Sequence, residues 1–187
     1  LVFPSDKPGD LGSYWNVSLL CRWKDIANIG LDLFASGALG FLGPNDEAIS
    51  YPFGPNGESV PVLGLASADV GGDTPFFVFV GGRYRLPLDS DAAPKFGFEY
   101  NHASRYWISF AQPTSNLTNK LANRGHAYEA YYLQPLNDAL YTRLSYQFID
   151  TRYTGGFFGG LDPRMGGTSP PVDQHLHAIS LVLDASF

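Results

Sequence analysis

Hydrophobic residues recur at every second position in seven segments of this chain, which restricts its fold to β-structure. A strand with this period has one apolar face and one mixed face. The clearest example lies at the end of the sequence, where Ser180, Asp184 and Ser186 are interleaved with Ile179, Leu181, Leu183, Ala185 and Phe187. The earlier segments lie at about 14–23, 27–36, 76–86, 96–101 with a possible extension to Phe110, 127–134 and 140–148.

Composition excludes several other classes of protein. The 187 residues include 21 Gly and 14 Pro, which disfavour a helical fold. We expect one short helix, at 115–123, capped by Ser115. The sequence contains no run of about 18 apolar residues, so we expect no membrane-spanning helix. The net charge of −6 argues against a nucleic-acid partner, and the single cysteine cannot form an internal disulfide.

The connections between the segments alternate in length. We expect short ones at 24–25, 88–93 and 135–138, and long ones at 37–73, 111–125 and 153–173. Outer-membrane barrels have short periplasmic turns and long external loops. The sequence therefore predicts an all-β fold: an antiparallel, up-and-down transmembrane β-barrel in the bacterial outer membrane.

Aromatic side chains lie near the ends of these segments, as in the aromatic belts of membrane proteins. Trp23, Tyr84, Phe96 and Phe187 are expected at the periplasmic rim. The outer rim is expected to carry a second group, namely Tyr100, Tyr106, Trp107 and Tyr153.

Two resemblances support the barrel. The final strand resembles the terminal strand of bacterial outer-membrane barrels, which implies that the assembly machinery reads Ile179, Leu181, Leu183 and Phe187. In addition, residues 95–155 resemble a porin-like outer-membrane family of Gram-negative bacteria that has no assigned function. This similarity rests on Lys95–Asn101, Tyr106-Trp107, Asn119–Gly125, Ala127-Tyr128-Glu129, Tyr132, Gln134-Pro135, and Asp150 with Tyr153-Thr154-Gly155. It implies no catalytic residue and no cofactor.

Seven strands do not complete a bacterial single-chain barrel, which has an even number. An open sheet would leave unpaired backbone groups in hydrocarbon. We therefore expect residues 1–187 to be a single barrel segment, the carboxy-terminal part of a longer chain. Identical subunits that close one ring together are the alternative.

If the apolar faces contact lipid, the charged side chains between them line the lumen. A charge on the lipid face costs about 2–4 kcal/mol for Arg or Lys at the midplane. The wall is either a filter that selects solutes or a salt-bridged interior. Its expected members are Arg22, Asp32, Arg83, Arg85, Lys95, Glu99, Glu129 and Arg143.

The expected function is passive diffusion of small hydrophilic solutes, with no enzymatic activity. A structural sheath around a cytochrome or a surface filament is the main alternative. A less favoured one is an outer-membrane lipase that uses the outward-facing His102 and Ser104. His175 and His177 share one side of a strand, but without a nearby acid pair we interpret them as surface imidazoles and expect no metal.

Overall fold

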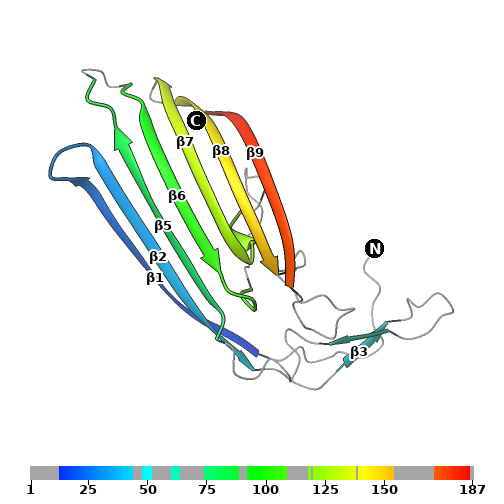
Figure 1. The fold of residues 1–187 in the computed structure, drawn as a ribbon. Coiled ribbons are helices and arrows are strands. Elements are labelled where there is room, and N and C mark those ends of the chain that lie inside the picture. The colour runs from blue at the N-terminus through cyan, green and yellow to red at the C-terminus, as the bar shows by residue number, and fades with distance from the viewer. Residues whose placement is uncertain are drawn as a thin grey trace.

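The protein is described from a computed structural model, which covers residues 13–43, 48–51, 60–63, 74–88, 92–108, 118, 120–137, 139–153 and 171–185. Seven strands form one antiparallel sheet, and each strand pairs with its neighbours in chain order (Figure 1). This confirms the prediction of an all-β, up-and-down sheet. The strands are β1 (Ser13–Ile26), β2 (Leu31–Gly43), β5 (Phe76–Arg85), β6 (Lys95–Ala103), β7 (Gly125–Asn137), β8 (Leu140–Tyr153) and β9 (Pro171–Ala185).

The sheet is open in the described structure, with β1 at one edge and β9 at the other (Figure 1). The three short connections lie at the end of the sheet where β9 finishes, and we call this the short-turn end. The strand ends joined by the longer connections are at the opposite end of the sheet, which we call the long-loop end. Among the described residues, no helix is long and apolar enough to cross a membrane.

The first hairpin differs from its prediction. The expected turn at 24–25 belongs to β1, and residues 27–30 form the turn instead, so the strand predicted from Ala27 starts at Leu31. Asp25 explains the shift, because its carboxylate accepts a hydrogen bond from the Gly30 amide at 2.8 Å. Asp25, Ala27 and Asn28 have positive φ angles, which suit a tight turn rather than a strand.

The long connections also differ from expectation. Residues 37–43 extend β2, and a hairpin of β3 (Ala48–Tyr51) and β4 (Val60–Leu63) follows in the segment predicted to be a loop (Figure 1). Strand β6 ends at Ala103 rather than near Phe110, which lies outside the described residues. The predicted helix at 115–123 is wrong over its described part, where only a 3-10 turn, η2 (Lys120–Ala122), is present.

Strand register divides the side chains into two faces. On the apolar face, directly paired residues include Val17 with Leu39, and Leu144 with Leu181. Large side chains there are open to solvent, and Ile179 is 78% exposed. The apolar face crosses all seven strands, with Trp15, Leu39, Val78, Phe98, Tyr128, Leu144 and Leu181 as representative members.

The opposite, charged face carries the buried part of the molecule. The described residues of the β6–β7 connection, 104–108, 118 and 120–124, lie over this face, and we call them the covering segment. Its Trp107 stacks on Phe77 of β5 with ring centroids 5.4 Å apart, and Thr118 donates a hydrogen bond to Gln147 of β8. The core is therefore polar as well as apolar, since Asn101 and Glu129 are both 1% exposed.

Candidate functional site

A buried ion cluster lies where the covering segment meets β6 and β7. Glu99 and Glu129 are direct cross-strand partners, so their carboxylates share one face. Lys120 from the covering segment forms ion pairs with both carboxylates. Its backbone carbonyl accepts a hydrogen bond from the Asn101 side chain at 2.9 Å, which fixes its position. Lys120 thus neutralises a site where two acids would otherwise repel each other.

The ion cluster continues across β7 to β8. Arg143 donates from Nη2 to the second Glu129 oxygen at 2.6 Å, and its guanidinium lies 4.4 Å from the centre of the Tyr131 ring. Arg83 of β5 donates to the Tyr131 hydroxyl at 3.3 Å. The Tyr131 ring also occupies the space above Gly97, where a Cβ would lie 2.1 Å from the ring. Glycine at position 97 therefore allows the tyrosine to pack between two arginines.

A cavity of about 380 Å³ lies beside this cluster, toward the short-turn end. Its charged lining comprises Arg83, Lys95, Arg143 and Glu99, so three basic groups face one acid. Lys95 is also the direct cross-strand partner of Arg85. Like charges in this arrangement are unfavourable unless an anion or water screens them. The wall of the cavity is therefore suited to solutes that carry negative charge.

The register places all eight predicted wall residues on the charged face, but it divides them into separate groups. Arg22 and Asp32 form a separate pair between β1 and β2, with charged atoms 3.9 Å apart and side chains that are 53% and 29% exposed. Glu99 was expected within reach of Arg83 and Arg85, yet it pairs with Lys120. Sequence reasoning missed Lys120 and Tyr131. Lys120 lies in a connection whose path no local pattern indicates, and Tyr131 lies in the segment whose faces were ambiguous.

Arg124 anchors the carboxyl end of the covering segment. Its side chain is buried and donates from Nε to the Trp107 carbonyl at 2.9 Å. Its own carbonyl accepts hydrogen bonds from the amides of Arg152 and Tyr153. Burial lowers the pKa of the Arg124 guanidinium to about 10, so it is charged at neutral pH. Arg124 thus ties both ends of the described covering segment to β8.

The aromatic residues of the covering segment do not form the predicted outer rim. Tyr106 and Trp107 are buried, and Trp107 lies over the charged face. Other rings form a row on the apolar face near the long-loop end. Rings of neighbouring strands contact each other. The ring centroids of Tyr100 and Tyr128 are 5.1 Å apart, and those of Phe148 and His177 are 4.9 Å apart. Such a row is typical of an interfacial aromatic belt.

All four histidines lie on the apolar face, either within this row or between it and the long-loop end. The rings of His102 and His126 are 4.5 Å apart, and Tyr100 hydrogen-bonds His126. The Ser104 hydroxyl, considered above as a lipase nucleophile, accepts a hydrogen bond from the Phe76 amide at 2.8 Å. His102 contacts the rings of His126 and Phe76, so the described geometry gives no support to a Ser–His pair.

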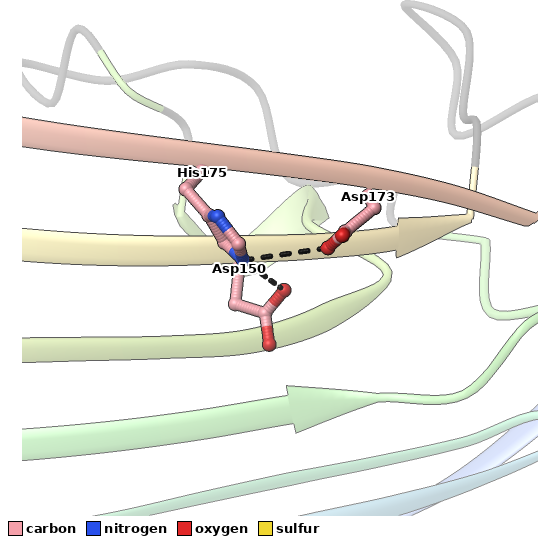
Figure 2. A group of neighbouring side chains, drawn as sticks. All are labelled: Asp150, Asp173 and His175. Carbon is pink, nitrogen blue, oxygen red and sulfur yellow. Dashed lines mark ion pairs between the residues drawn. The ribbon is translucent and has the colours of Figure 1, made fainter.

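One group of side chains at the long-loop end has metal-ligand chemistry. His175 of β9 is the direct partner of Asp150 of β8, and Asp173 lies two residues before His175 on the same face. Figure 2 shows both carboxylates beside one nitrogen of the His175 ring, with an ion pair drawn to each. The acid pair that the sequence seemed to lack is therefore supplied partly by the neighbouring strand.

Comparison with known proteins identifies a family but no function. No curated protein and no solved structure matches the chain. Residues 3–161 match the family described as Protein of unknown function (DUF3373), which covers most of the sequence. The chain therefore belongs to the DUF3373 family.

Proposed function

We propose that this protein is a porin-like barrel of the bacterial outer membrane, which allows passive diffusion of small hydrophilic solutes. The observation that carries the proposal is the contrast between the two faces of the sheet. Large apolar side chains, such as Trp15 at 72% and Leu181 at 75% exposure, lie on one face along all seven strands. The other face holds the charged side chains and the covering segment. Water satisfies the second face and hydrocarbon the first.

The dimensions of the apolar face fit a bilayer. On β1 it extends from Trp15 to Trp23, or about 27 Å along the strand. At the usual strand tilt of about 40° this corresponds to roughly 20 Å of membrane thickness, close to the apolar band of known barrels. Among the described strand residues, Lys, Arg, Asp and Glu occur on this face only beyond the aromatic row, at Asp150, Arg152 and Asp173.

The open edges require partners in this setting. Each unpaired backbone group in hydrocarbon costs several kcal/mol, so β1 and β9 must pair with something. We propose that further strands, from the same polypeptide or from other copies of it, close the sheet into a barrel. Membrane lipid is then the partner of the apolar face, and the barrel-assembly machinery is the expected partner of β9, which contains Ile179, Leu181 and Leu183. The fourth residue of that prediction, Phe187, lies outside the described residues.

The decisive experiment is conductance of the purified protein in planar bilayers. A porin-like barrel gives stepwise currents. Because Arg83, Lys95 and Arg143 make the wall basic, the reversal potential in a salt gradient is expected to show a preference for anions. Replacing Arg83 and Lys95 with Gln reduces this preference, whereas replacing Ser18, on the same face of β1, with Gln does not. Membrane insertion without any current would refute the channel.

A second function has one specific observation in its favour. The covering segment occupies part of the charged face, as a filled lumen requires. A structural sheath that encloses or anchors a partner protein, such as a cytochrome, is therefore our alternative proposal. This alternative predicts membrane insertion and negligible conductance. It also predicts that one partner protein co-purifies with the barrel in every preparation. We propose no enzymatic activity for either case.

A further inference from the structure

We infer that Asp150, Asp173 and His175 form a binding site for a divalent transition-metal ion at the long-loop end of β8 and β9. The position follows from strand pairing. Asp150 and His175 are directly opposite across the two strands, and Asp173 is on the same side of β9 as His175. Three ligand atoms therefore converge from two strands, as Figure 2 shows. This inference does not depend on the proposed function.

The distances suit a metal ion without movement of the backbone. His175 Nε2 lies 3.4 Å from Asp150 Oδ1 and 3.4 Å from Asp173 Oδ1. All three ligand atoms are within 4.8 Å of one another. Two ligands at about 2.1 Å from Zn²⁺, arranged tetrahedrally, are themselves about 3.4 Å apart. An ion can therefore occupy the space between these atoms.

A buried oxygen without a hydrogen-bond partner is the second observation that indicates a ligand. The Asp150 residue is 7% exposed, and its Oδ1 has no hydrogen-bond partner among the residues that the structure describes. Its other oxygen accepts a hydrogen bond from Arg152 Nε at 2.9 Å. A buried carboxylate oxygen is rarely left without a hydrogen bond, and this one is directed toward His175 Nε2 at 3.4 Å. A bound cation would satisfy it.

The surroundings match those of known metal sites. Arg152 orients Asp150, as outer groups orient ligating carboxylates in metalloproteins. The Phe148 ring lies 5.8 Å from the His175 ring. Arg152 adds one positive charge, and its Nη1 lies 3.9 Å from Asp173 Oδ1. The two carboxylates carry two negative charges, so the site keeps a net negative charge that attracts a divalent cation. His175 and Asp173 are exposed, which gives the ion a path of entry.

The donor set limits the identity of the ion. One imidazole and two carboxylates favour borderline or hard divalent ions, such as Zn²⁺ or Mn²⁺, over Cu⁺, which prefers sulfur ligands. Three protein ligands leave the remaining coordination positions to water. Because β9 pairs on one side only in the described sheet, an ion bound here would fasten its long-loop end to β8.

The test is calorimetric titration of Zn²⁺ into the full protein in detergent, after treatment with EDTA. The wild type is expected to bind Zn²⁺ at a saturable site, and His175→Ala is expected to weaken that binding about tenfold or more. Asp173→Asn changes an exposed side chain, so its expected loss of affinity cannot arise from misfolding. The matched control is His177→Ala, because His177 lies on the same face of β9 but bonds the Tyr146 hydroxyl at 2.7 Å.

Three results would overturn the inference. They are wild-type affinity in both His175→Ala and Asp173→Asn, an equal loss in His177→Ala, and no saturable binding below about 1 mM. Zn²⁺ held instead by His102 and His126 would persist in His175→Ala and give the first of these results. Titration with Co²⁺ supplies a spectroscopic readout, since the visible absorption of the bound ion depends on its ligands.

Discussion

Lys120→Met tests whether the covering segment is held by charge. The substitution retains an apolar side chain over Phe79, whose ring centre lies 5.9 Å from the Lys120 ammonium, but it removes the positive charge between Glu99 and Glu129. The Glu129 side chain is fully buried and keeps only Arg143 as an ion-pair partner among the described residues. Glu99 loses its described ion-pair partner altogether. The variant is therefore expected to be less stable.

The magnitude follows from the register. Direct cross-strand partners have side chains about 5 Å apart. Two unit charges at that distance repel each other by about 3 kcal/mol at an effective dielectric constant of about 20. Removal of one member from a buried ion cluster usually costs about 3–5 kcal/mol, which agrees with this value. We expect Lys120→Met to lower the free energy of unfolding by about 3 kcal/mol.

The assay is equilibrium urea unfolding of the full protein in lipid vesicles, followed by tryptophan fluorescence. A double-mutant cycle isolates the interaction. Glu99→Gln removes one of the two repelling charges, so the pair Lys120→Met and Glu99→Gln is expected to recover more than half of the loss. A loss below about 1 kcal/mol, or strict additivity of the two changes, would refute the reasoning.

The remaining predictions concern the two faces and two glycines. Leu19→Arg places a charge in the middle of the apolar face and is expected to destabilise the membrane-inserted protein by about 2–4 kcal/mol. Ser18→Arg, one residue away on the opposite face, is the control, and an equal effect of both in vesicle unfolding would contradict the lipid assignment. Gly97→Val is expected to displace the Tyr131 ring and cost about 1–3 kcal/mol in the same assay. Gly125→Ala is expected to be more harmful, because Gly125 has a φ of +143° and its Cβ would lie 2.2 Å from the Asp150 carbonyl; a neutral result in the unfolding assay would contradict the tight packing there.

Local alternation was enough to predict the seven strands of the large sheet and their order, because each short connection joins neighbours. It also placed Arg83, Lys95, Glu99 and Arg143 on one face, since a period of two fixes the side of every residue in a strand. The first turn was misplaced because the alternation continues through Ala27 and Ile29 by coincidence. The carboxylate of Asp25, which bonds Gly30, decides that turn.

Contacts between distant segments were beyond such reasoning. Asp173 is close to His175 in the sequence, but Asp150 is far from it, and only the β8–β9 register completes the acid pair. Likewise, no period in the sequence shows that the covering segment folds back onto the sheet. That segment contributes Trp107, which stacks on Phe77 instead of lying at the rim. It also contributes Lys120, which changes the charge balance of the wall.

The covering segment also determines which charges of the wall remain available to a solute. By sequence alone, the acids Glu99 and Glu129 seem to balance Lys95 and Arg143. In the structure, Lys120 pairs with both acids from the other side, and Arg143 shares Glu129. Because Lys120 neutralises these acids, the charges of Arg83 and Lys95 in the cavity are not balanced, and the cavity is basic. This holds although the whole chain carries a net charge of −6. In the channel that we propose, a change that releases the covering segment is therefore expected to widen the lumen and to weaken the preference for anions.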